Sequence, residues 1–213
     1  MVIAIDGPAG AGKSTVARAL AERLEMPYLD SGAMYRCVAL SAIRTGTDFD
    51  DESGLAELAR GLDISVGRDG VRVNGEDVTE AIRAPEVSVA ASRVSVHRPV
   101  REAMVDRQRE LIAAADYVAE GRDIGTVVSP TAPLKVFLTA SDGERARRRA
   151  AETDEPLERV AAALRSRDAR DRDREHGALR PAPDATQIDT SGLEVEAVVD
   201  RIVAMARERR LVP

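Results

Sequence analysis

The chain has 213 residues, 44% of them hydrophobic and 32% charged, with a formal net charge of −6. This length predicts one α/β core with an insertion rather than two equal domains. The acidic balance argues against a nucleic-acid partner. A single cysteine, Cys37, excludes an internal disulfide, and no apolar run approaches the ~18 residues that a membrane-spanning helix needs. We therefore expect a cytoplasmic protein with no membrane partner and with a buried structural thiol.

The first expected strand, Val2 to Ile5, runs directly into a glycine-rich loop. This loop fits the phosphate-loop pattern at every fixed position. Its glycines let backbone N–H groups turn inward around a phosphate chain, and the helix that begins near Ser14 directs its positive dipole end to the same place. We assign ATP binding to the whole stretch: Gly7, Pro8, Ala9, Gly10, Ala11, Gly12, Lys13, Ser14 and Thr15.

Two side chains of this loop have expected roles of their own. Lys13 is placed to reach the outer phosphates, and the hydroxyl of Ser14 is placed to ligate the magnesium ion that accompanies them. A structural Gly/Ala turn is the alternative explanation. Val16, Leu20 and Leu24 argue against that alternative, because they form the apolar helical stripe that should follow a phosphate loop.

A second short strand, Pro27 to Asp30, leads through Ser31 into a helix from Ala33 to about Thr45. Polar groups at the carboxyl end of such a strand lie where ligands bind in open α/β folds. Simple capping of the helix by Asp30 explains the same residues. Both interpretations stay open at this point.

The stretch from about residue 49 to 84 has a different pattern. Glu52 to Leu62 is expected to be helical, and the strands 63–66 and 71–73 are joined by a turn at Gly67-Arg68-Asp69-Gly70. Asn74-Gly75 offers a second tight turn. An antiparallel patch within an otherwise alternating β/α chain indicates an inserted subdomain.

Further helices begin at Pro85 and Pro99. A buried strand from Tyr117 then runs into Glu120-Gly121-Arg122-Asp123, so that a second strand end carries charge. The third clear core strand is 134–138, and residues 139–142 can cap the helix that begins near Gly143.

The region from Arg145 onward is very highly charged. An acidic break at 152–156 is a candidate tip of a mobile lid, which we place at about 143–160. In the helix from Leu157 towards His176, four residues fall within an arc of about 100° and can face one cleft: Arg167, Arg170, Asp171 and Arg174. A solvated helix with ion pairs is the usual explanation of such a run. A last strand, 187–189, and an amphipathic helix complete the chain, and neither histidine has the spacing of a metal site.

Among phosphate-loop proteins, this chain fits the small-molecule kinases. A GTPase needs an Asn-Lys-x-Asp guanine reader, yet Lys13 and Lys135 are the only lysines and neither lies in one. A motor ATPase usually has a longer apolar strand than 117–120 before its acidic residue. Arginines at several strand and helix ends suit an enzyme that holds two phosphate substrates in line. A kinase of another acceptor and a nucleotide-dependent switch remain as alternatives.

Four blocks together resemble the bacterial cytidylate kinases, in that family's order and over essentially the whole length: residues 7–15, 29–36, 120–128 and 167–172. The resemblance implies a single nucleoside monophosphate (NMP) kinase domain of the phosphate-loop type, with a parallel sheet flanked by helices. Its core would be 1–48, 85–142 and 161–213, with an antiparallel NMP-binding insertion at about 49–84 and a short helical lid at about 143–160. It also implies a monomer that transfers the ATP γ-phosphoryl group to CMP or dCMP with magnesium.

The family's pattern assigns ten residues to CMP. They would hold the monophosphate (Ser31, Tyr35, Arg36), the cytosine (Ser92, Arg101, Asp123), its phosphate (Arg122, Arg174) and its sugar (Arg167, Asp171). The chemistry fits, because a carboxylate such as Asp123 accepts from the exocyclic amine of cytosine, where uracil presents a carbonyl. The expected catalytic residues are Lys13, Arg122, Arg174 and a lid arginine, for which we favour Arg149 and keep Arg145 and Arg148 as alternatives. A solvated helix surface also explains these lid arginines.

Overall fold

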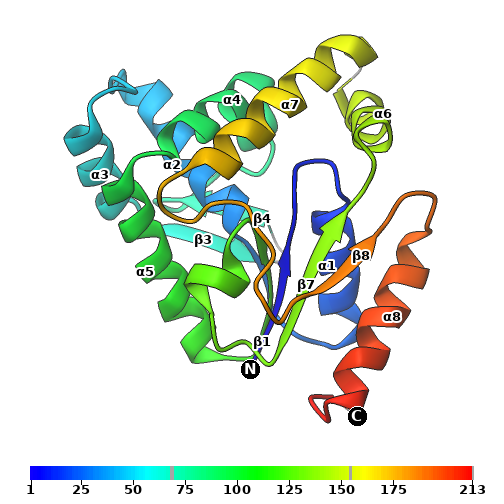
Figure 1. The fold of residues 1–213 in the computed structure, drawn as a ribbon. Helices are drawn as coiled ribbons and strands as arrows, with labels where there is room; N and C mark the ends of the chain where they lie inside the picture. The colour runs from blue at the N-terminus through cyan, green and yellow to red at the C-terminus, as the bar shows by residue number, and fades with distance from the viewer. Residues whose placement is uncertain (68–69, 154, 213) are drawn as a thin grey trace.

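The computed structural model describes residues 1–67, 70–153 and 155–212. Its centre is a parallel sheet with the strand order β2-β6-β1-β7-β8 (Figure 1). Ile3 lies opposite Val118 on one side and Leu134 on the other, which places β1 between β6 and β7. The strands are β1 (Val2–Asp6), β2 (Tyr28–Asp30), β6 (Tyr117–Gly121), β7 (Leu134–Thr139) and β8 (Thr186–Asp189). The predicted parallel sheet is confirmed.

Helices cover both faces of this sheet, which explains why β1 is apolar without alternation. Val2 and Ala4 pack on one face, whereas Ile3 and Ile5 pack on the other. The first face is covered by α2 (Ser31–Thr45), α4 (Pro85–Val94) and α5 (Arg98–Ala114), and the second by α1 (Lys13–Arg23) and α8 (Val195–Glu208). Cys37 of α2 is fully buried, and burial raises the pKa of its thiol to about 12, as expected of a structural cysteine.

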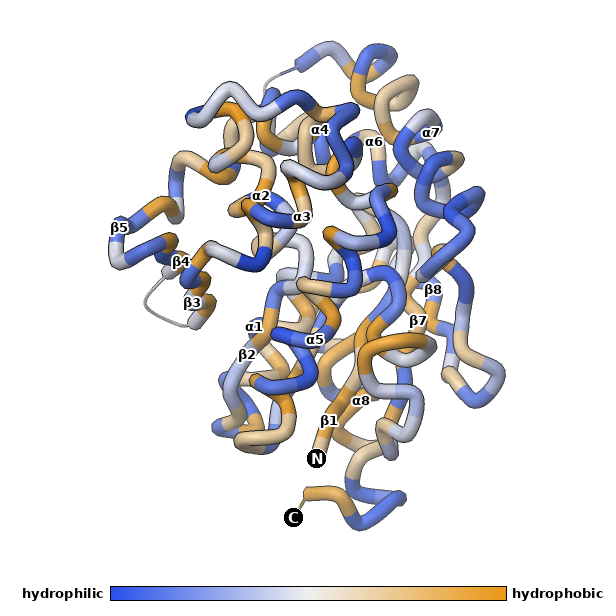
Figure 2. The backbone as a smooth tube through the Cα atoms, turned by 90° about the vertical axis from the view of Figure 1, so that its left-hand side faces the viewer, coloured by the Kyte–Doolittle hydropathy of each residue, from blue (hydrophilic) through white to orange (hydrophobic). Residues whose placement is uncertain are grey.

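A second, antiparallel sheet lies to one side of the molecule (Figure 2). Asn74 and Gly75 both have positive φ, 52° and 83°, as the expected two-residue turn requires. The elements of this region are α3 (Glu52–Gly61), β3 (Ile64–Gly67), β4 (Gly70–Val73), β5 (Glu76–Asp77) and η1 (Ala81–Arg83). Arg68 and Asp69, which we expected in the first turn, lie outside the described residues. The boundaries of the insertion stay a prediction.

Two helices, α6 (Asp142–Thr153) and α7 (Leu157–Asp173), lie beyond the carboxyl ends of β1 and β7 (Figure 1). They pack on each other, and most of α7 is hydrophilic (Figure 2). The π-helical turn η2 (Ile124–Val128) follows β6. The described part of the expected lid, residues 143–153 and 155–160, covers almost all of α6 and the start of α7. No helix of the described residues is long and apolar enough to cross a bilayer.

Candidate active site

The loop between β1 and α1 leads into the first turn of a helix, whose amide groups can bind an anion. Gly12 is the N-cap residue of α1 and has φ 81°, a left-handed conformation that suits glycine. Because glycine has no side chain, it does not cap the helix with a side-chain hydrogen bond. The first N–H groups of a helix have no partner within it. The start of α1 therefore has the chemistry of a phosphate site.

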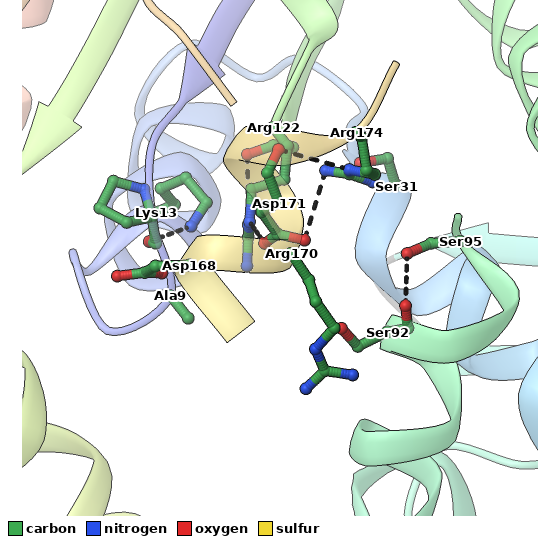
Figure 3. Close-up of polar contacts among 12 residues, drawn as sticks. Ala9, Lys13, Ser31, Ser92, Ser95, Arg122, Asp168, Arg170, Asp171 and Arg174 are labelled. Carbon is green, nitrogen blue, oxygen red and sulfur yellow. Dashed lines mark hydrogen bonds and ion pairs between the residues drawn. The ribbon is translucent and has the colours of Figure 1, made fainter. Parts of the chain in front are cut away.

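Lys13 is almost fully buried in this loop, where its Nζ donates to the carbonyl of Pro8 at 2.8 Å (Figure 3). Burial and then the nearby Arg122 lower the pKa of Lys13 to about 7, although Glu120 acts in the opposite direction. A phosphate bound beside the amine would raise this pKa again. Lys13 is thus poised to gain charge when an anion arrives.

Two oxygen-bearing side chains, those of Ser14 and Glu120, lie near this lysine. The side chain of Ser14 is exposed in the first turn of α1, and Glu120 is buried at the end of β6 with the Tyr28 hydroxyl donating to its carboxylate. Burial and then Asp30 raise the pKa of Glu120, whereas Lys13 and the hydroxyl groups of Tyr28 and Ser14 lower it. The described residues contain no cluster of three metal-binding side chains. One hydroxyl with one carboxylate suits an ion that takes its other ligands from phosphates and water.

A cavity of about 870 Å³ extends from this loop towards α2 and α7. Besides the loop, six arginines line it, and four of them come from α2, the end of β6, α6 and α7: Arg36, Arg122, Arg149 and Arg167. Burial and then Arg122 lower the pKa of Arg167 to about 9, with Arg36 and Arg149 acting in the same direction and Asp171 against them. Crowded guanidinium groups favour a polyanion, and the volume is that of a small-molecule site.

Asp171 of α7 organises the arginines behind the cavity. Arg122 Nε donates to its Oδ2 at 2.9 Å, and Arg174 Nη2 lies 3.4 Å from its Oδ1 (Figure 3). Burial alone would raise the pKa of Asp171, but Arg122, Arg174 and Arg167 together lower it. Arg170, which we expected on the same face, donates instead to the carbonyl of Ser166 at 3.4 Å.

The residues expected to contact cytosine are buried and do not line the large cavity. Arg101 forms an ion pair with Asp123, its guanidinium carbon lies 5.7 Å from the centre of the Tyr35 ring, and Gly177 packs against the ion pair. Burial raises the pKa of Tyr35 to about 12. The structure thus brings Arg101 into contact with both Tyr35 and Asp123. Ser92, the other residue expected to contact cytosine, is buried on α4.

Among the described residues, buried polar atoms without a hydrogen bond are concentrated in the expected acceptor site. Six of its ten residues have one: Tyr35, Arg36, Ser92, Arg101, Arg167 and Arg174. Native proteins leave few such atoms unsatisfied, and each calls for an explanation. A bound polar ligand would supply partners for several of them.

Of the two explanations offered for the end of β2, the structure shows the capping, and the ligand-binding role stays a prediction. The carboxylate of Asp30 accepts from the N–H of Ala33 at 2.8 Å, so it caps α2, and its other oxygen accepts from Arg36 at 2.8 Å. The hydroxyl of Ser31 donates to the carbonyl of Glu120 at 2.7 Å. Capping therefore also orients one of the cavity arginines.

The three arginines considered for the lid role lie in different surroundings. Arg145 is buried against the phosphate loop, and Arg148 donates to the side chain and carbonyl of Thr190. Arg149 alone among them lines the large cavity, where it pairs with Glu152 at 2.9 Å. Its catalytic role stays a prediction.

Sequence reasoning missed Asp6, the last residue of β1. Its two carboxylate oxygens accept from the N–H groups of Ile124 and Gly125, each at 2.8 Å. Burial raises its pKa to about 6. The available signal was its place at the carboxyl end of an apolar strand, where parallel sheets present polar side chains. Asp6 thereby ties the phosphate loop to the turn that carries Arg122 and Asp123.

Comparisons with known proteins identify the family of this chain. A family model described as cytidylate kinase matches residues 3–208. A cytidylate kinase of Geobacter sp. (strain M21) is 47% identical, covering 98% of this chain and 94% of the relative, and one of Geobacillus kaustophilus (strain HTA426) is 48% identical, covering 97% and 96%. A solved gluconokinase from Sinorhizobium meliloti 1021 shares the fold, with a TM-score of 0.52 at 17% identity over 98% of this chain and 93% of that one. The chain therefore belongs to the cytidylate kinase family.

Proposed function

We propose that the loop end of the cavity binds the magnesium complex of ATP and that the arginine-lined end binds the acceptor. Membership of the family supplies the acceptor class: the protein is a kinase that transfers a phosphoryl group to CMP or dCMP, giving CDP or dCDP. The observation that carries the proposed acceptor site is the set of buried polar atoms that lack a hydrogen bond within the described chain, on six of the ten expected residues.

The chain's own residues would act by position and charge, without a covalent intermediate. Lys13 would hold the outer phosphates of ATP, and Arg122 and Arg174 would neutralise the acceptor phosphate as it approaches the donor. Arg149 is the proposed lid arginine, because it reaches the cavity from α6. Arginines in such positions increase the rate by about 10³–10⁵ in other phosphoryl transferases.

Magnesium would supply charge neutralisation on the donor phosphates. Ser14 and Glu120 are the oxygen donors at this end of the cavity and would hold the ion together with the phosphates. A chelator should therefore abolish turnover, and added magnesium should restore it. We also propose that the protein acts as a monomer and that it works in the cytoplasm, where reducing conditions suit a single buried cysteine such as Cys37.

Recognition of cytosine would require Asp123 to accept from the base amine. In this structure one of its oxygens accepts from Arg101, so CMP must rearrange or share that ion pair. A carboxylate left buried without its partner is costly, which would penalise a base that lacks the amine. Selectivity for cytosine over uracil would follow from this difference.

An acceptor panel tests the proposal. ADP release is measured with ATP, magnesium and one acceptor at a time: CMP, dCMP, UMP, AMP or shikimate. We expect turnover with CMP and dCMP well above the others. Activity confined to an acceptor without cytidine would overturn the proposal, and tight ATP binding with no acceptor-dependent turnover would instead favour a nucleotide-dependent switch.

A further inference from the structure

Arg145 of α6 joins three parts of the molecule through one buried guanidinium group. Its Nη1 donates to the carbonyl of Ala9 in the phosphate loop at 3.0 Å and to Asp168 Oδ2 of α7 at 2.5 Å. Its Nη2 donates to Asp142 Oδ1, at the start of α6, at 2.5 Å. Ala9 and Asp168 consequently lie side by side (Figure 3).

Close packing supports this contact. Ala9 forms a small apolar cluster with Ala146 of α6 and with Val160 and Leu164 of α7. At Gly10, φ is 77°, and a Cβ atom there would lie 2.9 Å from both the Cβ and the carbonyl oxygen of Arg145. The backbone of α6 therefore rests directly on the phosphate loop, which leaves little room for the loop to move independently of the helix pair.

The same contact reaches both ends of the large cavity. Ala9 and Gly10 line its donor end. Asp168 adjoins Arg167 in the sequence, and Asp171 lies one helical turn further along α7. A ligand that shifts α7 by contacting Arg167 and Asp171 would also shift Asp168, and Asp168 acts on the carbonyl of Ala9 through Arg145.

The ion pair between Arg145 and Asp168 would be costly to break. Both side chains are 3–4% exposed, so a broken pair would leave an uncompensated buried charge. Within the part of the chain that the structure describes, Arg145 Nε and Asp168 Oδ1 have no hydrogen-bond partner. A position of α7 that gave these two atoms hydrogen-bond partners would be favoured. Binding of the acceptor could shift α7 to such a position.

We propose that Arg145 is a positioning residue that couples the two substrates, by fixing the donor loop at Ala9 to the position of α7. The inference rests on the proposed assignment of ATP and CMP to the two ends of the cavity. It requires no contact between Arg145 and either substrate, unlike the lid role considered for this residue above. Such coupling is reciprocal, so CMP and ATP raise each other's affinity by the same factor.

The test is a set of binding constants measured by calorimetry. The Kd of CMP is determined with and without a saturating non-hydrolysable ATP analogue, and the Kd of the analogue with and without CMP. We expect a coupling factor of about 5–150 for the unmodified protein. In Arg145→Lys, which keeps the charge beside Asp168 but loses the planar fork, the factor should fall to nearly 1. The Kd of CMP alone should stay within about threefold, because Arg145 does not touch it.

Arg147→Lys is the matched control, since Arg147 lies on the same helix with its side chain 68% exposed and pairs with Glu144 on that helix. It should leave the coupling factor unchanged. Asp168→Asn provides a second route to the same loss if Arg145→Lys does not fold, and thermal unfolding is measured for each variant.

An unchanged coupling factor in a folded Arg145→Lys or Asp168→Asn variant would overturn the proposal. Equal weakening of both substrates at constant coupling would also overturn it, because that result is expected of a merely structural residue. Absence of CMP binding to the unmodified protein would contradict the proposed function instead, so the two failures are distinguishable.

Discussion

Binding of ATP is expected to draw a proton onto Lys13. In the structure, burial and Arg122 hold the pKa of this amine at about 7, against 10.5 for an ordinary lysine. A triphosphate beside the amine favours its charged form and raises the pKa towards the ordinary value. The protein therefore takes up protons wherever the free amine is neutral and the bound one is charged.

The size of this uptake follows from the two pKa values. With a free pKa of about 7, roughly half of the Lys13 amines are neutral at pH 7, about 0.9 at pH 8 and about 0.1 at pH 6. Uptake linked to Lys13 should thus rise from ~0.1 to ~0.9 proton per ATP between pH 6 and pH 8. Over the same range, the loss of charge in the free protein weakens its attraction for ATP.

Calorimetry in buffers of different ionisation enthalpy measures this uptake directly, because the apparent binding enthalpy changes in proportion to the protons exchanged with the buffer. Lys13→Met serves as the control, and subtracting its value removes the protons contributed by ATP and by other groups. The difference between the two proteins should follow the stated rise with pH. A difference that stays constant from pH 6 to pH 8 would refute the lowered pKa of Lys13.

Three further substitutions test other parts of the site. Asp123→Asn should reduce the preference for CMP over UMP by about 1–3 kcal/mol, measured as the ratio of kcat/KM values, and an unchanged ratio would place base recognition elsewhere. Arg149→Ala should lower kcat by about 10²-fold or more with little change in the KM of CMP, whereas Arg147→Ala should leave kcat unchanged. If kcat were unchanged in both variants, Arg149 would belong to the solvated surface, like Arg147. In Asp6→Asn, the side-chain NH₂ group would face one of the two buried N–H groups that Asp6 now accepts from, and that N–H would lose its acceptor. We expect the free energy of unfolding, measured with urea, to fall by about 1–3 kcal/mol. An unaltered midpoint would show that one acceptor oxygen suffices.

The parallel sheet and its helices could be predicted because the relevant signals are local. The apolar run Val2–Ile5, the glycines of the loop and the Asn74-Gly75 turn each determine their own backbone. The arginines that converge on the cavity come from elements far apart in the chain. Spacing along α7 placed Arg167 and Asp171 on one face, but it could not show that Arg170 donates to its own helix instead.

Contacts that join distant segments were harder to predict. Asp6 accepts from the N–H groups of Ile124 and Gly125, which are 118 and 119 residues away in the sequence. No local pattern in the sequence predicts a contact over that distance. Likewise, the three lid arginines are nearly equivalent in sequence. Their different surroundings follow from the close approach of α6 to Gly10, which only the assembled fold determines.

The burial of Cys37 makes the protein convenient for spectroscopy. Thiol reagents attack the thiolate, and a buried cysteine with a pKa of about 12 forms very little of it at neutral pH. A cysteine introduced at an exposed site on α6, such as position 147, would therefore react selectively without removal of the natural one. A fluorescent label at that position would report directly on the movement of the helix pair when each nucleotide binds.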